Sequence, residues 1–243
     1  MTITTPPVMG HRGAPSLAPE NTLAGFQACF EAGATWTETD VCLLGDGTPV
    51  IFHDATLDRC TNRSGSITGI RADDLGTINA NQQFPEQGFQ PIPTLSQALP
   101  FFEARGMGLN LELKRHDHVA ASALVEATTD ILRASSFPLD RLLLSSFDFE
   151  ALRLARAAMP EAAIAVIAED ATVEVFDVAR ELQATALNLW WETLSFAQVQ
   201  QAKAKGLNVN IWTANDPALV ASMAHWGVGS IMSDYPQRFI EEA

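Results

Sequence analysis

Short apolar or β-branched runs alternate along the chain with longer segments in which apolar residues recur every three or four positions. Runs such as "GLNLEL" at 108–113 and "AAIAVIA" at 162–168 are typical of buried strands. Segments such as 147–160 and 216–227 end at Pro or Gly and are typical of amphipathic helices. The pattern predicts eight strands, at residues 7–11, 35–41, 108–113, 141–146, 162–168, 185–190, 207–212 and 228–233.

Strands that alternate with helices imply parallel pairing, and eight such units favour a closed (β/α)8 TIM barrel over an open sheet. Residues 54–92 interrupt this rhythm, because they are rich in Gly, Asn, Asp and Pro and contain no helix of useful length. We interpret them as a small insertion after the second strand, a lid or side wall at the carboxyl ends of the strands. The length suits one barrel, so we expect a single domain over residues 1–243.

Charge and composition narrow the classes of partner. The chain has 29 acidic and 15 basic residues, and its net charge of −14 repels nucleic acid and anionic lipid surfaces. We therefore expect neither nucleic acid nor a stable membrane association. The first ten residues lack the pattern of a signal peptide and no apolar run could span a bilayer, which favours a cytoplasmic location. Cys29, Cys42 and Cys60 show no CxxC spacing, which favours unpaired, buried thiols.

Three carboxylates lie near the ends of predicted strands. Glu38 and Asp40 are two positions apart, so both side chains point to one side of their strand, and Glu112 ends the next barrel strand in the same phase. Two unscreened carboxylates at this spacing, about 7 Å, repel by roughly 2 kcal/mol, which favours a bound cation. An all-oxygen ligand set suits Mg²⁺, Ca²⁺ or Mn²⁺ better than zinc. The alternative is a purely structural network in which the acids pair with Arg12 and Lys114.

Two histidines and two cations accompany the acids. His11 and His53 end separate strand segments, and a pair of imidazoles can act as general acid and general base near neutral pH. Either histidine alone would more often be structural. Arg12 and Lys114 add fixed positive charge, which suits a phosphoryl oxygen better than a neutral substrate.

Other polar and aromatic residues near this set leave alternatives open. Glu20 either steadies Arg12 or remains solvated, and Asn21 or Thr22 caps the helix that follows. Trp212 ends another predicted strand, where it either packs in the core or forms an apolar wall for the substrate.

The order and spacing of the motifs resemble the glycerophosphodiester phosphodiesterase family nearly from end to end. Most motifs are short, but their order and spacing together are specific to the family. The last motif departs from the family pattern at Ser233 and Tyr235, so we draw no conclusion from that loop. The motifs are "HRGA" at 11–14, "PENT" at 19–22, "ETD" at 38–40, "DGTPVIFHD" at 46–54, "LDRCTNRSG" at 57–65, "LELK" at 111–114, "SSF" at 145–147, "IWT" at 211–213 and "SDYP" at 233–236.

The resemblance implies a role for each candidate. By analogy, His11 and His53 are the acid–base pair, Glu38, Asp40 and Glu112 hold a divalent metal ion, Arg12 and Lys114 contact the phosphate, and Trp212 flanks the glycerol. The implied reaction is metal-dependent cleavage of a glycerophosphodiester to glycerol 3-phosphate and an alcohol such as choline or ethanolamine. Water or the glycerol 2-hydroxyl could attack first.

Two alternatives to this function remain at the level of the sequence. One is a related barrel phospholipase that acts on intact lipids, which would need an apolar or basic docking surface. The other is a non-catalytic barrel that binds phosphorylated ligands, for which we would expect one of the five candidate histidines and acids to be missing. All five are present.

Overall fold

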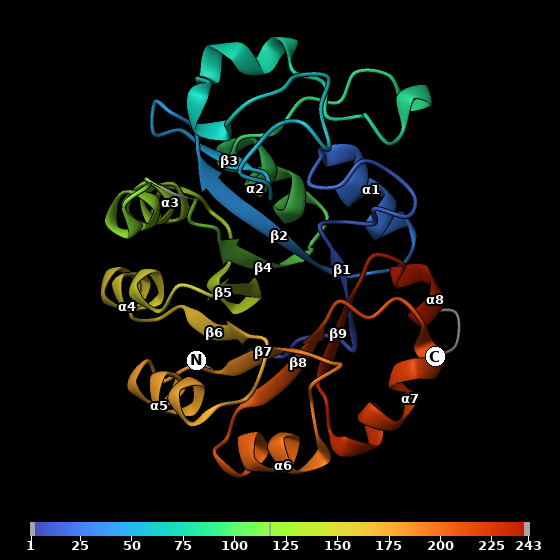
Figure 1. Ribbon diagram of the computed structural model, residues 1–243, viewed down its shortest axis with the longest axis vertical. Helices are drawn as coiled ribbons and strands as arrows, with labels where there is room; N and C mark the ends of the chain where they lie inside the picture. The colour runs from blue at the N-terminus through green and yellow to red at the C-terminus, as the bar shows by residue number, and fades with distance from the viewer. Residues whose placement is uncertain (1–2, 117, 241–243) are drawn as a thin grey trace.

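The computed structural model describes residues 3–116 and 118–240. Its eight predicted strands form a closed parallel barrel with helices on the outside, and the barrel closes where β1 pairs with β9 (Figure 1). This confirms the predicted TIM-barrel fold. In order around the barrel the strands are β1 (Val8–His11), β2 (Trp36–Leu43), β4 (Gly108–Leu113), β5 (Leu142–Ser146), β6 (Ala163–Ala168), β7 (Ala186–Trp190), β8 (Asn208–Trp212) and β9 (Ser230–Ser233).

The outer helices cover the barrel in chain order. Most of them begin at a side-chain cap; the Thr22 hydroxyl, for example, accepts a hydrogen bond from Gly25 N at 3.0 Å, so Thr22 rather than Asn21 caps the first helix. The helices are α1 (Leu23–Glu31), α2 (Leu95–Ala104), α3 (Ala121–Ala134), α4 (Phe149–Ala158), α5 (Val173–Glu181), α6 (Phe196–Ala204), α7 (Pro217–Trp226) and α8 (Pro236–Ile240).

The insertion follows a short additional strand. β3 (Pro49–Ile51) pairs antiparallel with the end of β2, and the segment after it contains three 3₁₀ turns, at Ile67–Gly69, Ala72–Thr77 and Pro85–Gln87. The predicted insertion after the second barrel strand is therefore confirmed. It packs around a small apolar cluster that it shares with β2 and β3, which includes Leu57, Cys42 and Val50, and it lies at one side of the barrel, at the top of Figure 1.

The strands are buried on both faces. Successive side chains along a strand alternate between the space outside the barrel, beneath the helices, and the interior of the barrel. On β4, the leucines at 109, 111 and 113 belong to the large cluster between barrel and helices, while Asn110 and Glu112 point into the barrel. A separate cluster that includes Trp36, Leu143 and Met232 lies between these polar residues and the amino ends of the strands. Gly108 leaves room for it, because a Cβ there would stand 2.0 Å from the Trp36 ring.

Two expectations about the whole chain can be compared with the structure. All three cysteines are buried and free, as predicted. Among the described residues, no helix combines the length and the apolar character that a membrane span requires.

Candidate active site

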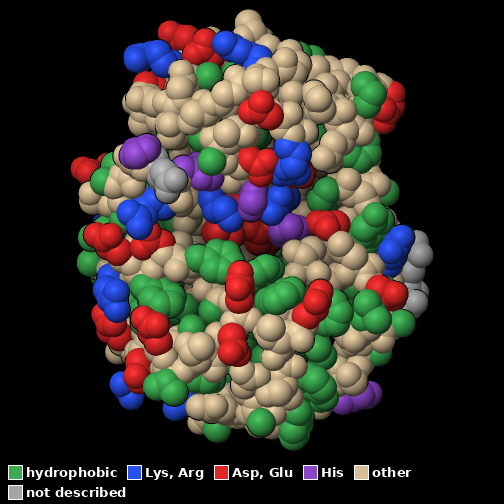
Figure 2. All heavy atoms as spheres, viewed as in Figure 1, with side chains coloured by type: hydrophobic (Ala, Val, Ile, Leu, Met, Phe, Trp, Pro, Cys, Tyr) green, Lys and Arg blue, Asp and Glu red, His purple; other side chains and the backbone are tan. Residues whose placement is uncertain are grey.

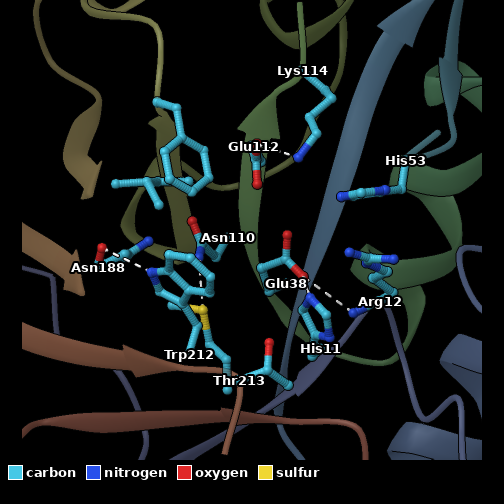
Figure 3. Close-up of a pocket in the computed structure, with 13 residues that line it drawn as sticks. His11, Arg12, Glu38, His53, Asn110, Glu112, Lys114, Asn188, Trp212 and Thr213 are labelled. Carbon is cyan, nitrogen blue, oxygen red and sulfur yellow. Dashed lines mark hydrogen bonds and ion pairs between the residues drawn. The ribbon is translucent and has the colours of Figure 1, made fainter. Parts of the chain in front are cut away.

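Strand register brings the three predicted carboxylates together. Asp40 on β2 is the register partner of Glu112 on β4, and Glu38 lies between His11 on β1 and Asn110 on β4. One ligand atom from each of the three acids lies within 4.8 Å of the others, and all three acids are buried. Glu38 and Glu112 line one pocket at the carboxyl ends of the strands (Figure 3), where TIM barrels hold their active sites.

The three carboxylates carry more negative charge than the two neighbouring cations, Arg12 and Lys114, can neutralise. Burial, with repulsion from the other two acids, raises the pKa of Glu38 well above its ordinary value, and burial beside Asp40 raises the pKa of Glu112 to about 7. Burial also acts to raise the pKa of Asp40, but Arg12 and Lys114 hold it below the ordinary value. Asp40 Oδ1 accepts no hydrogen bond from any described residue. A buried carboxylate oxygen without a donor is what a cation ligand requires.

The turn after β1 holds His11 and Arg12 against the acids. Arg12 adopts a left-handed backbone (φ 53°), and its N–H donates to Glu38 Oε2 at 3.1 Å. Gly13 follows with φ 92°, and a Cβ there would meet the backbone of Gly25 on α1 at 2.8 Å. Asn21 fixes the turn from the other side, because its N–H donates to Arg12 O and its Nδ2 donates to Asp40 Oδ2 at 3.0 Å.

Each histidine contacts an aspartate through Nδ1. His11 Nδ1 lies 2.7 Å from Asp234 Oδ1, and His53 Nδ1 lies 2.7 Å from Asp54 Oδ1. Hydrogen bonds and nearby cations outweigh burial and lower the pKa of both aspartates, so each is an ionised acceptor and each Nδ1 is the donor. Both rings line the pocket, and their Nε2 atoms remain for proton exchange; His11 Nε2 lies 3.8 Å from Glu38 Oε2 (Figure 3).

Both cations are paired with acids, and a chain of ion pairs connects Arg12 to the insertion. Lys114 Nζ donates to Glu112 Oε1 at 2.9 Å, and Arg12 Nη1 donates to Glu20 Oε1 at 3.0 Å. Glu20 is thus bonded to Arg12 rather than solvated. Arg59, from the insertion, donates to both oxygens of Glu20 and to both oxygens of Asp54 at 2.6–2.8 Å. One guanidinium therefore links the carboxylate that holds Arg12 to the carboxylate that holds His53.

The opposite side of the pocket contains most of its apolar side chains. The Trp212 ring lies edge-on to Phe147, with ring centroids 5.5 Å apart, and Ile167 and Met232 complete the wall. The cavity is small, about 100 Å³. In the space-filling view, histidine, acidic and basic side chains gather in a hollow between the insertion and the barrel (Figure 2).

The structure places all eight predicted site residues around this pocket or in direct contact with residues that line it. Seven line it, and the eighth, Asp40, contacts Arg12 and Lys114 from beneath. His53 differs from expectation in one respect, because β3 ends at Ile51 and His53 lies in the loop beyond it.

Sequence reasoning gave no role to several residues that support the site. Asp234 lies in the loop that received little weight, although it holds His11. Asp54 and Arg59 were visible within the motifs but not as partners of His53 and of each other. The adjacency of His53 and Asp54 was the one local signal available.

Comparison with known proteins agrees with this geometry. Residues 11–238 match the model of the "Glycerophosphoryl diester phosphodiesterase family". A glycerophosphodiester phosphodiesterase from Caldanaerobacter subterraneus subsp. tengcongensis is 28% identical over 234 residues, which cover 96% of each chain. A phosphodiesterase from Oleispira antarctica, solved in complex with the product sn-glycerol-3-phosphate, superposes with a TM-score of 0.93 at 35% identity and covers 98% of this chain and 96% of its own. The chain belongs to the glycerophosphoryl diester phosphodiesterase family.

Proposed function

We propose that this protein hydrolyses glycerophosphodiesters to glycerol 3-phosphate and an alcohol by histidine acid–base catalysis with a divalent metal ion. The observation that carries the proposal is the cluster of three buried carboxylates, two of which line a pocket together with two aspartate-bound histidines and two cations. The family match and the product bound to the Oleispira antarctica relative support the substrate class.

Glu38, Asp40 and Glu112 would hold the ion. Their all-oxygen set fits Mg²⁺, Ca²⁺ or Mn²⁺, and Asp40 Oδ1, which accepts no hydrogen bond from the described residues and lies 3.6 Å from Lys114 Nζ, offers a ligand atom. A divalent charge would offset the repulsion that, together with burial, raises the pKa values of the two glutamates. When bound, such an ion polarises a phosphoryl oxygen and neutralises charge that develops on it.

The remaining chemistry belongs to side chains of the chain itself. Arg12 and Lys114 bind the other phosphate oxygens, and Trp212 flanks the glycerol. One imidazole accepts a proton through Nε2 from the attacking oxygen, either that of water or that of the glycerol 2-hydroxyl. The attacking oxygen forms a bond to phosphorus, the bond from phosphorus to the alcohol oxygen breaks, and the other imidazole donates a proton to the departing alcohol. Attack by water gives glycerol 3-phosphate directly. Attack by the 2-hydroxyl gives a cyclic phosphate, and a second step then follows in which water attacks phosphorus, the ring bond to the 2-oxygen breaks, and the two imidazoles exchange roles.

The test is release of choline from glycerophosphocholine by the purified protein, with and without excess chelator. We expect turnover with added Mg²⁺, Ca²⁺ or Mn²⁺, loss of turnover in chelator, and recovery when the cation is restored. Activity that survives chelation would overturn the metal site, and absence of release with every cation from a folded protein would overturn the function. Vesicles of intact phosphatidylcholine in a parallel assay test for a phospholipase, and we expect no cleavage there.

A further inference from the structure

Three buried asparagines lie in the barrel interior beside the carboxylate cluster. Asn110 on β4 and Asn188 on β7 line the pocket, while Asn210 on β8 is the register partner of Asn188. All three are at most 1% exposed. Burying a primary amide is costly unless its oxygen and its nitrogen both find partners, so three such residues at one level of the barrel require an explanation.

The hydrogen bonds among these amides leave three polar atoms without a partner among the described residues. Two of them, one donor and one acceptor, belong to Asn188 and Asn110, which line the pocket, while the third is Asn210 Oδ1. Asn210 Nδ2 donates to Asn188 Oδ1 at 2.9 Å, which fixes the orientation of the Asn188 amide and leaves its Nδ2 without a partner among the described residues. Asn110 Nδ2 lies 3.7 Å from the sulfur of Met232. Asn110 Oδ1 has no hydrogen-bond partner among the residues that the structure describes. The two side chains lie near Trp212 on the same side of the pocket (Figure 3).

The chemistry of this pair selects one kind of ligand group. A hydroxyl both donates and accepts, so one hydroxyl can accept from Asn188 Nδ2 and donate to Asn110 Oδ1. A phosphate or carboxylate oxygen could only accept and would face the Asn110 oxygen unfavourably, and an ammonium could only donate. The apolar wall of Trp212 and Met232 beside the amides suits the carbon atoms that carry such a hydroxyl.

From this geometry we infer that Asn110 and Asn188 bind a free hydroxyl of the glycerol unit, so that the enzyme selects glycerol diesters over diesters of alcohols that lack this hydroxyl. The inference rests on the proposed function and adds to it the residues that read the substrate. An analogue without the hydroxyl would leave a buried donor and a buried acceptor unpaired, which is the situation in which enzymes discriminate most strongly.

The test compares glycerophosphocholine with two analogues in which one or the other glycerol hydroxyl is replaced by hydrogen. We expect the wild-type kcat/KM to favour the glycerol substrate over one analogue by roughly 10- to 100-fold, and Asn188→Leu and Asn110→Leu to reduce that ratio to within about 3-fold. The ratio should collapse because the variants lose activity on the glycerol substrate while their activity on the analogue changes little. A wild-type ratio that persists in both variants would overturn the inference.

A second variant and a matched control separate specificity from stability. Asn188→Asp preserves size and removes the pocket-facing donor, so a folded Asn188→Asp protein should also lose the ratio; retention of the ratio there counts against the inference. Thr128→Val on α3 removes another buried hydroxyl without a hydrogen-bond partner in the described chain, far from the pocket, and should keep the wild-type ratio. Loss of the ratio in Thr128→Val would show that destabilisation alone produces the effect.

Calorimetric titration with Mg²⁺ present distinguishes this inference from the proposed function, because it needs no turnover. Glycerol 3-phosphate should bind the wild type more tightly than its deoxy analogues, and Asn188→Leu should abolish the difference. If this holds but no diester is cleaved, the proposed function fails and the inference stands. If diesters are cleaved with equal efficiency whether or not the hydroxyl is present, the proposed function stands and the inference fails.

Discussion

The two histidines of the pocket receive the same support from two different regions of the molecule. His11 ends β1, and its aspartate, Asp234, follows β9, 223 residues away in the chain, so the pair forms only because the barrel closes between these strands. His53 lies in a loop beyond β3, beside its own aspartate in sequence, and Arg59 of the insertion holds that aspartate in place.

The difference indicates which half of the site is the more adjustable. The Asp234 side chain is also bonded to Asn215, whose Nδ2 donates to it and whose Oδ1 accepts from the Asp234 N–H, so this pair belongs to the frame of the barrel. The His53 pair instead depends on a guanidinium that is about two-fifths exposed, on a segment that packs around the small apolar cluster shared with β2 and β3. We expect the insertion to tune the His53 half, while the barrel fixes the His11 half.

Removal of each imidazole is the strongest test, because the proposed mechanism needs both halves. His11→Ala and His53→Ala should each lower turnover of glycerophosphocholine by at least about 1,000-fold, since each removes one proton transfer. Circular dichroism should show an unchanged fold in both. If either variant kept a tenth of the wild-type rate, that histidine would have no acid–base role and the two halves would not be equivalent.

Replacement of each aspartate by asparagine should have the next largest effect. Asp54→Asn and Asp234→Asn keep the shape but remove the charge that orients the histidine, and we expect each to lower kcat/KM by about 100-fold. Asp54→Asn should also change the pKa of His53. Burial lowers the pKa of His53, and the charges of Arg12 and Lys114 lower it further, while the charge of Asp40 and the hydrogen bond to Asp54 act in the opposite direction.

Loss of the Asp54 charge should therefore lower the pKa of His53 further and move the limb of the pH–rate profile that reports this residue to lower pH. The profile of kcat/KM in both variants and the wild type is the measurement. A limb that moves to higher pH in Asp54→Asn, or that does not move, would show that the aspartate does not act on His53 through its charge.

These supporting contacts are also the part of the site that the sequence did not predict. The barrel and the acid cluster follow from rules that operate over short distances: strands alternate with helices, and Glu38 and Asp40 share a strand face. The contact between His11 and Asp234 depends on barrel closure and on a loop after the last strand, which no local pattern encodes.

The His53 half was unpredictable for the opposite reason. Adjacent residues on a strand point to opposite sides, so a reading of "FHD" as a strand end gives no reason to pair His53 with Asp54. Their contact requires the loop conformation that follows Ile51. The free atoms of Asn110 and Asn188 were likewise invisible, because an asparagine in a strand does not show which of its two polar atoms will be satisfied.

The smallest effect should come from Arg59, which contacts neither substrate nor metal ligand directly and acts through other residues. Arg59→Lys replaces a planar group that makes four hydrogen bonds to Glu20 and Asp54 with a single ammonium, which cannot satisfy both carboxylates in the same way. We expect kcat/KM for glycerophosphocholine to fall by about 3- to 10-fold, with the His53 limb of the pH profile moved in the same direction as in Asp54→Asn. Arg63→Lys is the matched control, since Arg63 lies in the same insertion, is similarly exposed and pairs with Asp74 away from the pocket.

A positioning role for Arg59 through Asp54 also predicts non-additivity. Once Asp54→Asn has removed the charge on which Arg59 acts, Arg59→Lys should cost less than it does in the wild type, because only its contact with Glu20 remains to be lost. Additive losses in the double variant would mean that Arg59 reaches the site only through Glu20 and Arg12. Arg59 would then support phosphate binding alone, and Asp54 would position His53 without help from Arg59.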